Sequence, residues 1–436
     1  MEKILIIGSG AREHAIAKSL EKSKHPKMIY CLATNMNPGI AEICEEILIG
    51  NINDNHFVCD YGKEIGATIA IVGPENPLAR GVSDSLWDNN IPVVGPKREL
   101  AQIETSKAFT RKLQHDYKIP GAPVYKYFRT IDGVEEFLKE LGKNYVVKYD
   151  GLAGGKGVKV SGDHLKSHKE ALNHCHSLIK NNQSFLIEEK FIGQEFSLMS
   201  FCDGKNLKHM PVVQDHKRAY EGDTGPNTGG MGTYTDHDHS LPFLNGKDIK
   251  EAHQINFQTA KALKKKFKTG YKGILYGGFM ATENGIRLIE YNARFGDPEA
   301  MNVLSLLKTD FIDICKGIVS QSLDEINVIF ERKATVCKYA VPKGYPEKPI
   351  KDQPIDVSNI KSKDSLFYAS VEIKNGQLVE SGSRTMAIVG KAETITKAEK
   401  IAEEEICLVK GPLFHRKDIG TEKLIKEKVD QMNSLR

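Results

Sequence analysis

Short apolar runs alternate with helical patterns through the first hundred residues. The runs cover residues 4–7, 28–31, 68–72 and 93–94, and each is soon followed by Gly, Pro or Asn. Ala15, Ile16 and Leu20 fall on one face of a predicted helix over residues 11–21. Alternating strands and helices are typical of an open parallel sheet, so we predict an α/β fold here.

The middle of the chain mixes helices with β patterns. We predict one helix over residues 99–113 and a second that Asp132 caps, with Val134, Phe137 and Leu138 on its apolar face. A hairpin is predicted over residues 145–160, strands over 185–188, 195–201 and 287–292, and a long helix over 247–268. This part is therefore expected to be α+β.

A last, smaller mixed section is predicted beyond about residue 325. Its pattern indicates strands over residues 334–341 and 385–390 and a helix over 395–409. The chain has no internal repeat and no low-complexity tract.

Composition and charge exclude several classes of protein. The 436 residues include 61 Lys and Arg against 57 Asp and Glu, and this surplus of 4 is too small to indicate a nucleic-acid or membrane surface. No run approaches the ~18–20 apolar residues that span a bilayer. The eight cysteines are scattered without a C-x-x-C pair, so we expect reduced, mostly buried thiols and a cytoplasmic protein.

The first strand is followed by a glycine loop that opens a helix. Gly8 and Gly10 precede Arg12 and Glu13, a context in which backbone N–H groups hold phosphate and Arg12 adds a bidentate donor. A dinucleotide fingerprint would need a third glycine where Glu13 stands, which disfavours that ligand. The alternative is a tight turn that only packs helix on strand.

A second loop occupies the same edge of the predicted sheet. Pro74, Glu75 and Asn76 follow the strand at 68–72, and ligands of parallel sheets lie at the carboxyl ends of the strands. We therefore expect these residues to contribute to a binding site.

The hairpin turn at residues 150–157 is unusually rich in glycine. It is not a Walker loop, because Gly157 stands where that motif requires Ser or Thr after Lys156. Gly154 and Gly155 would let the backbone close over polyphosphate oxygens, while Lys148 and Lys156 supply positive charge. The alternative is a loose hairpin tip.

Two oxygen donors share one face of a predicted strand. Glu290 and Asn292 are spaced i and i+2, and carboxylate and amide oxygens suit Mg²⁺. Arg294 and Asp297 follow in a turn that fits a zwitterion and a metal-bound phosphate. A solvated strand face is the alternative.

The passage 214–232 has no periodicity and is dense in Gly, Asn and Thr. A disordered linker is the alternative to a binding loop. The candidate binding residues in it are Asp215, Lys217, Arg218, Asp223, Thr224, Gly225 and Asn227.

Taken in order, these passages resemble the phosphoribosylamine–glycine ligase (glycinamide ribonucleotide synthetase) family of the ATP-grasp superfamily. The resemblance covers nearly the whole chain, and the run Asp-Thr-Gly-Pro-Asn-Thr-Gly-Gly-Met-Gly at 223–232 is its most specific part. It implies an amino-terminal phosphate-binding domain at 1–103, an ATP-grasp domain at 104–325 with a flap subdomain at about 121–190, and a carboxy-terminal domain at 326–436.

The resemblance also implies the reaction and the roles of residues. ATP would phosphorylate glycine and the amine of 5-phosphoribosylamine would attack the glycyl phosphate, giving glycinamide ribonucleotide, ADP and phosphate in purine biosynthesis. Mg²⁺ or Mn²⁺ would bind Glu290 and Asn292, and a monomer is expected, with a dimer as the alternative. The implied catalytic residues are Lys148, Lys156, Arg294 and Asp297; the ATP-binding residues are Lys107, Lys148, Gly154, Gly155, Lys156, Glu188, Glu189 and Glu195; and the substrate-binding residues are Gly8, Gly10, Arg12, Glu13, Pro74, Glu75, Asn76, Arg294 and the seven of the 214–232 passage.

Departures from the family pattern are small. Ala11 stands where the family usually has a second glycine, Gly154 stands where it has Ala, and the strand at 277–280 lacks an acid that many ATP-grasp enzymes use for metal. The number of metal ions therefore stays open. Two other readings are a related carboxylate–amine ligase and an ATP-binding regulator without turnover.

Overall fold

The amino-terminal section is built on an open sheet of five parallel strands, of which the sequence predicted four and missed Glu46–Ile49. The computed structural model describes residues 1–154 and 157–436. Strand order is β3-β2-β1-β4-β5, and β1 is buried from Ile4 to Ile7, which is why it reads as a continuous apolar run. The elements are β1 (Glu2–Ile7), α1 (Ala11–Glu21), β2 (Lys27–Ala33), α2 (Pro38–Ala41), β3 (Glu46–Ile49), α3 (Asn55–Glu64), β4 (Ile69–Val72), α4 (Glu75–Arg80), α5 (Val82–Asp88) and β5 (Val93–Val94).

The helix predicted over 99–113 is two helices, so that prediction was wrong. Helices α6 (Arg98–Thr105) and α7 (Lys107–Asp116) are separated by Ser106, whose backbone is extended. The Ser106 hydroxyl accepts a hydrogen bond from the Phe109 N–H at 3.1 Å and donates to Asp150 at 3.1 Å. An N-cap in mid-pattern therefore starts a new helix beside the glycine-rich turn.

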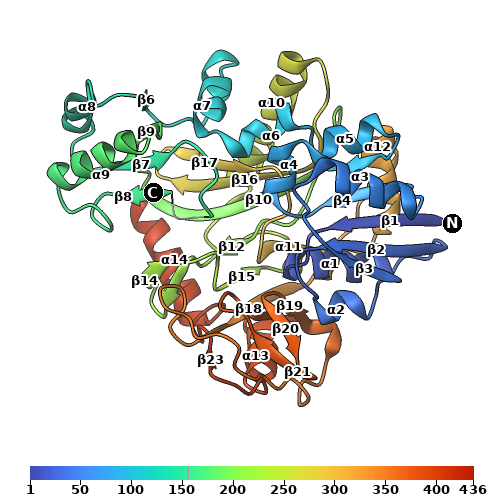
Figure 1. Cartoon of the computed structure of the whole chain (residues 1–436). Helices are drawn as coiled ribbons and strands as arrows, with labels where there is room; N and C mark the ends of the chain where they lie inside the picture. The colour runs from blue at the N-terminus through green and yellow to red at the C-terminus, as the bar shows by residue number, and fades with distance from the viewer. Residues whose placement is uncertain (155–156) are drawn as a thin grey trace.

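The next sheet carries the predicted hairpin. Its order is β6-β9-β7-β8, with antiparallel pairing throughout, and α8 and α9 pack on it (Figure 1). The predicted Asp132 cap is wrong: Gly133 is the N-cap of α8, at φ +77°, with no side-chain hydrogen bond. The elements are β6 (Tyr125–Phe128), α8 (Val134–Leu141), β7 (Tyr145–Tyr149), β8 (Val158–Val160), α9 (His168–Lys180) and β9 (Phe185–Glu189).

A second antiparallel sheet lies in the middle of the molecule (Figure 1). Its order is β11-β10-β16-β17, and the long helix α10 packs on it. The predicted strand at 287–292 and helix at 247–268 are confirmed. The elements are β10 (Gly193–Asp203), β11 (Leu207–His209), α10 (Gly246–Phe267), β16 (Lys272–Thr282), β17 (Gly285–Asn292), α11 (Glu299–Leu306), α12 (Phe311–Ser320) and the 3₁₀ turn η1 (Leu323–Glu325).

The carboxy-terminal sheet recruits two strands from the 214–232 passage and the residues just after it. Its order is β12-β15-β18-β22-β19, with β23 also paired to β18. No local pattern in the sequence indicates this pairing between strands a hundred residues apart. The elements are β12 (Gln214–Asp215), β13 (Arg218–Tyr220), β14 (Thr224–Asn227), β15 (Gly232–Thr235), β18 (Ala334–Pro342), the 3₁₀ turn η2 (Lys363–Ser365), β19 (Leu366–Tyr368), β20 (Val371–Lys374), β21 (Gln377–Glu380), β22 (Met386–Ala392), α13 (Ile395–Ile406), β23 (Leu413–Phe414) and α14 (Glu422–Leu435).

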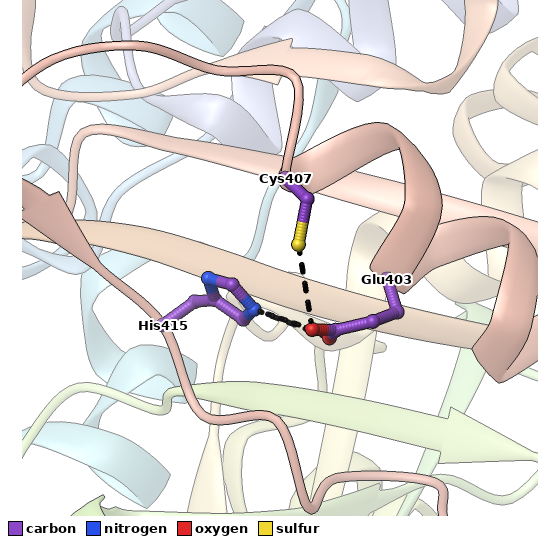
Figure 2. Close-up of side chains that lie close together, drawn as sticks. All are labelled: Glu403, Cys407 and His415. Carbon is purple, nitrogen blue, oxygen red and sulfur yellow. Dashed lines mark hydrogen bonds and ion pairs between the residues drawn. The ribbon is translucent and has the colours of Figure 1, made fainter.

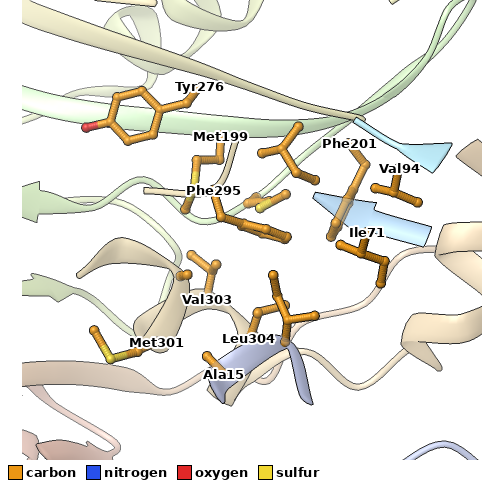
Figure 3. Close-up of a cluster of buried hydrophobic side chains, with 14 of the residues drawn as sticks. Ala15, Ile71, Val94, Met199, Phe201, Tyr276, Phe295, Met301, Val303 and Leu304 are labelled. Atoms are coloured by element: carbon orange, nitrogen blue, oxygen red, sulfur yellow. The ribbon is translucent and has the colours of Figure 1, made fainter. Parts of the chain in front are cut away.

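One hydrophobic core runs through the junction of the sections. In Figure 3, Ile71 and Val94 of the amino-terminal sheet lie near Phe201 of β10 and Phe295 of the turn after β17. The Phe201 and Phe295 rings meet edge to face, with centroids 6.2 Å apart. The two parts are therefore packed as one body.

Helix α1 also anchors the carboxy-terminal section. The Tyr368 N–H donates to His14 Nδ1 at 3.0 Å, and Lys18 donates to the Leu366 carbonyl at 2.8 Å. Burial lowers the pKa of His14 to about 3, so this imidazole is neutral and accepts the bond.

The cysteines fit the expectation of free thiols. Six of the eight are buried, Cys44 is half-buried and Cys407 is exposed. Among the described residues, no helix combines the length and apolar character that crossing a membrane requires.

Candidate active site

A cavity of about 740 Å³ lies where the three sections meet. Its walls come from α6 and α7, from strands β7, β9, β10 and β17, and from the glycine-rich passage around β12–β14. The predicted site residues that line it are Arg12, Glu75, Lys107, Lys148, Gly154, Glu188, Glu189, Glu195, Asp215, Lys217, Arg218, Asp223, Asn227, Glu290, Asn292, Arg294 and Asp297.

Other predicted site residues lie behind or outside this wall. Asn76 is exposed on α4, and Thr224 and Gly225 are exposed on β14. Gly155 and Lys156 lie outside the described residues. The remaining residues off the wall are Gly8, Gly10, Glu13 and Pro74.

A buried ion cluster supports Lys148. Glu188 receives Lys148 Nζ at 2.7 Å on Oε2 and Arg111 Nε at 2.7 Å on Oε1, and Arg111 Nη2 reaches Oε2 at 3.0 Å. Burial alone would raise the pKa of Glu188, but Arg111 and Lys148 lower it to about 2. Sequence reasoning missed Arg111 because an arginine on an amphipathic helix reads as a surface residue.

The Glu188 cluster predicts how the free energy of unfolding changes at acid pH. We expect Glu188→Gln to lower the free energy of unfolding at pH 7 by about 3–5 kcal/mol, since two buried cations lose their shared partner. The pKa of Glu188 is about 2 in the folded protein against 4.5 as the ordinary value, so its contribution is present above pH 4.5 and is lost as pH falls towards 2. Urea unfolding of both proteins at decreasing pH should therefore show the difference shrinking below about pH 4.5.

Glu136→Gln, at an exposed position on α8, is the matched control and should leave stability within about 0.5 kcal/mol. A Glu188→Gln deficit that stays constant down to the acid limit of folding would contradict the ionised cluster.

Glu290 projects among several cations. Burial would raise its pKa, but Lys217, Lys107, Lys148 and Arg294 together hold it below the usual range. Lys217 is in turn paired with Glu195 across the cavity floor. The carboxylate therefore stays ionised, and its surroundings suit a site where anionic phosphates and a cation assemble.

Arg294 is held between two acids, Glu75 of α4 and Glu104 of α6. Its Nε lies 3.4 Å from Glu75 Oε2 and its Nη2 lies 3.0 Å from Glu104 Oε1. Glu104 also accepts the Ala293 N–H at 2.7 Å, so it fixes the backbone beside Arg294. Asn292 Oδ1 accepts from Arg294 Nη2 at 3.2 Å, which links the predicted metal pair to the guanidinium.

Two further acids lie close together without a full set of partners. Asp215 and Glu299 both line the cavity, and Asp215 Oδ1 has no hydrogen-bond partner among the described residues. Burial and the neighbouring Glu299 carboxylate raise the pKa of Asp215. Tyr276 donates to Glu299 Oε1 at 2.7 Å. The pair forms an electronegative corner that suits a small cationic group.

Gly230 is required beside this corner. It has φ +110°, and a Cβ there would lie 2.7 Å from Asp215 Oδ1 and 2.7 Å from Pro298. Any side chain would therefore displace the carboxylate.

Asp297 is already held by protein groups. Tyr339 donates to its Oδ1 at 2.7 Å, and Arg384 Nη2 lies 3.2 Å from its Oδ2. Arg384 also donates to the Gly229 carbonyl at 2.6 Å and lies over the Tyr339 ring. Arg384 was missed from the sequence because it comes from just before β22, far along the chain.

The amino-terminal glycine loop is tied to Glu13. The Gly10 N–H donates to Glu13 Oε2 at 2.6 Å, the Gly8 N–H donates to the Leu32 carbonyl at 2.9 Å, and Arg12 Nε donates to Glu13 Oε1 at 2.7 Å. Arg12 Nη1 also reaches the Phe295 carbonyl at 3.2 Å. The loop therefore presents the Arg12 guanidinium, rather than the Gly8 and Gly10 amides, to the cavity.

The glycine-rich passage is clamped from the end of the chain. Arg416 Nη1 lies 2.7 Å from Asp223 Oδ1, and Lys428 of α14 pairs with Asp223 Oδ2. Arg416 also donates to the Arg218 carbonyl at 3.1 Å, and Arg218 pairs with Asp163 beyond β8 at 3.0 Å. These contacts order the passage as a hairpin of β13 and β14, so the disordered-linker alternative is wrong.

Comparison with known proteins first identifies the class of enzyme to which this chain belongs. The solved biotin carboxylase domain of the 2-oxoglutarate carboxylase of Hydrogenobacter thermophilus, a complex with MgADP and bicarbonate, superposes with a TM-score of 0.72 over 99% of this chain and 94% of its own, at 13% identity. Residues 105–300 match the model described as "Phosphoribosylglycinamide synthetase, ATP-grasp (A) domain". The fold is therefore that of an ATP-grasp enzyme, a class that uses ATP and a divalent metal.

Matches along the full length of the chain then identify the particular family. Residues 2–104 match the N domain and residues 335–422 the C domain of phosphoribosylglycinamide synthetase. The phosphoribosylamine–glycine ligase of Methanosarcina acetivorans is 50% identical over 434 residues, 100% of this chain and 98% of its own. The solved phosphoribosylamine–glycine ligase of Thermotoga maritima superposes with a TM-score of 0.82 at 26% identity, over 96% of this chain and 100% of its own. This chain belongs to the phosphoribosylglycinamide synthetase family and is an ATP-dependent ligase of purine biosynthesis.

Proposed function

We propose that this chain joins glycine to 5-phosphoribosylamine through glycyl phosphate, forming glycinamide ribonucleotide, ADP and phosphate. The observation that carries the proposal is the shared cavity. It holds Lys148 and Glu290 for a nucleotide, Arg294 for a carboxylate and Arg12 for a second phosphate on one continuous wall. A regulator that only binds ATP would not require Arg294 or Arg12 in the same cavity.

The ATP end of the cavity lies between the two antiparallel sheets. Lys107 and Lys148 would neutralise the phosphates, and Gly154 would approach them through the backbone. Gly155 and Lys156, which lie outside the described residues, are proposed for the same two roles from the sequence alone. Glu189 and Glu195 are proposed at the adenine and ribose. Because Arg111 and Lys148 occupy the Glu188 carboxylate, we assign Glu188 to positioning Lys148 rather than to contacting adenine.

The donor set fits a hard divalent cation, Mg²⁺ or Mn²⁺. Glu290 is ionised and Asn292 offers an amide oxygen beside it on β17, which is the oxygen chemistry such cations take. When bound, the ion would neutralise charge on the phosphate oxygens of ATP.

Glycine is proposed to bind between Arg294 and the acidic corner. Arg294 would hold the glycine carboxylate, while Asp215 and Glu299 would receive the ammonium group. Asp297, fixed by Tyr339 and Arg384, would orient this turn. Lys217 lies near both Glu195 and Asp215 and would place positive charge beside the reacting carboxylate.

The chemistry follows from this arrangement. A carboxylate does not react with an amine at neutral pH, so a carboxylate oxygen of glycine attacks the γ-phosphorus of ATP and ADP leaves. The amine of phosphoribosylamine then attacks the acyl carbon, phosphate leaves with that oxygen, and the amine loses a proton. Positioning and charge neutralisation carry the first step.

The route of oxygen tests the function. Glycine labelled with heavy oxygen in its carboxylate should deliver one labelled oxygen to each phosphate formed, with ADP as the other product. Mass spectrometry of the phosphate measures this. Unlabelled phosphate, or AMP and pyrophosphate as products, would contradict a glycyl phosphate.

Arg12 makes a separate prediction about phosphoribosylamine. Arg12→Ala should raise the KM for phosphoribosylamine about tenfold to a hundredfold, because a lost charge-assisted contact to phosphate costs about 1.5–3 kcal/mol. The KM values for ATP and glycine should change little. Steady-state kinetics with each substrate varied in turn will show whether the ATP value rises instead, which would assign the amino-terminal loop to the nucleotide.

The working units are proposed as 1–103, 104–325 with the flap at about 121–190, and 326–436. The loops that carry the remaining predicted residues are proposed to form the phosphoribosylamine site. Glu75, Arg218, Asp223 and Asn227 would contribute from the cavity wall, while Gly8, Gly10, Glu13 and Pro74 lie off that wall and Asn76, Thr224 and Gly225 are exposed. We also propose a cytoplasmic enzyme that works as a monomer, with a dimer as the alternative and with no nucleic-acid or membrane partner, in keeping with its near-neutral charge balance.

A further inference from the structure

Three side chains of different chemistry converge on the carboxy-terminal section, away from the active-site cavity. Figure 2 shows Glu403 and Cys407 on one face of the end of α13, with His415 facing them from the chain after β23. None of the three lines the cavity. A carboxylate, a thiol and an imidazole are the three groups that proteins use to bind zinc.

The spacing of the donor atoms fits a tetrahedral ion. Glu403 Oε1 lies 3.1 Å from His415 Nε2 and 3.5 Å from Cys407 Sγ, and all three ligand atoms lie within 4.8 Å of one another. Zinc bonds of about 2.0–2.3 Å at tetrahedral angles place ligand atoms about 3.3–3.6 Å apart. Small side-chain rotations therefore suffice to close the site.

Lys338 holds the carboxylate in the required orientation. Its fully buried ammonium lies 2.7 Å from Glu403 Oε2, 2.7 Å from Glu399 Oε1 and 2.8 Å from the Lys417 carbonyl. Lys338 thus holds Glu403 Oε2, His415 Nε2 lies 3.1 Å from both carboxylate oxygens, and Oε1 also faces Cys407. Outer groups that orient a ligand in this way are typical of metal sites.

Charge and access also suit a divalent cation. Lys338, Glu399 and Glu403 together carry one negative charge, and a Cys407 thiolate would add a second beside the exposed Lys417. Cys407 is the exposed cysteine among the eight, all of which lie in the described residues. An ion can therefore enter from solvent, the thiol proton can leave to water, and a water molecule can complete the shell.

We propose that Glu403, Cys407 and His415 bind one Zn²⁺, with water as the fourth ligand. The site has a structural consequence. His415 precedes Arg416, the residue that clamps Asp223 of the glycine-rich passage. Zinc would tie α13 to this segment and stiffen the far wall of the cavity without entering it.

A second group of donors, His25, Asp310 and Asp313, fits an ion less well. Asp310 Oδ2 already accepts from the Ser23 hydroxyl at 2.7 Å and the Lys24 N–H at 3.0 Å, and its Oδ1 caps α12. Its carboxylate is therefore used by the protein itself.

The test uses the full chain with saturating Mg²⁺, so that the hard-cation site is filled. Equilibrium dialysis should show one Zn²⁺ per chain, and Co²⁺ in its place should give a thiolate-to-cobalt charge-transfer band. Cys407→Ser and His415→Ala should each weaken Zn²⁺ binding at least about tenfold, and Cys407→Ser should abolish the band.

Cys44→Ser, at a half-buried thiol elsewhere, is the matched control and should leave both signals unchanged. Zn²⁺ should also slow iodoacetamide labelling of Cys407 in the unmodified protein, a readout that requires no variant to fold. The proposal is overturned if Co²⁺ gives no thiolate band and Zn²⁺ leaves the Cys407 labelling rate unchanged.

Discussion

Glu290→Gln is expected to lower turnover by at least about a hundredfold. The substitution keeps the size of the side chain and removes one negative charge from among Lys107, Lys148 and Lys217. A cation bound there would be held less tightly, and the phosphates of ATP would lose neutralisation in the transition state, where one such contact is worth about 10²–10³ in rate. Turnover is measured at saturating Mg²⁺, ATP and glycine.

A second readout and a control make this result specific. Mn²⁺ binding in the presence of an ATP analogue should weaken in Glu290→Gln. Glu283→Gln, at an exposed position in the turn between β16 and β17, should keep turnover and binding within about twofold. Normal turnover in Glu290→Gln would remove this carboxylate from the metal site.

Lys148→Met is expected to cause the second large fall in turnover. Lys148 is buried in the cavity wall, and its loss would remove a cation from the phosphates, so turnover should fall at least about a hundredfold. The fold should survive because Arg111 keeps two contacts to Glu188, at 2.7 and 3.0 Å. Steady-state kinetics and a urea unfolding curve separate the two quantities.

Lys159→Met is the matched control, since Lys159 lies on β8 opposite Val147 and does not line the cavity. Its turnover should stay within about twofold. If Lys148→Met unfolds instead, the Lys148 ammonium is needed to neutralise Glu188; if it folds and turns over normally, Lys148 does not contact the phosphates.

The parts of the fold that depend on residues close together in the sequence were predictable. The parallel strands, the hairpin of β7 and β8, and the shared face of Glu290 and Asn292 all follow from short-range periodicity and turn residues. The break at Ser106 was missed because the helical pattern continues on both sides of it, although serine is a favoured N-cap, and the cap at Gly133 was missed because the neighbouring Asp132 is the stronger cap signal in the sequence. Boundaries depend on backbone geometry that periodicity does not record.

The site was predictable only on the strands and loops that carry motifs. Glu104 and Arg111 lie on helices, where a charged residue looks like any solvent-facing one until a buried partner is known. Arg384 and Arg416 reach the glycine-rich passage from far along the chain. No window of sequence joins such pairs, because the contact exists only once the sheets have packed.

The pairing of β15 with β18 determines when during synthesis the cavity can close. Asp215 and Lys217 are synthesised long before β18. The partners of Asp223, Arg416 and Lys428, are synthesised later than β18. A nascent chain can thus complete its parallel sheet while the carboxy-terminal wall of the cavity is still missing. Premature termination before Arg416 removes both clamps of Asp223, so this wall of the cavity is secured only after Arg416 has been made.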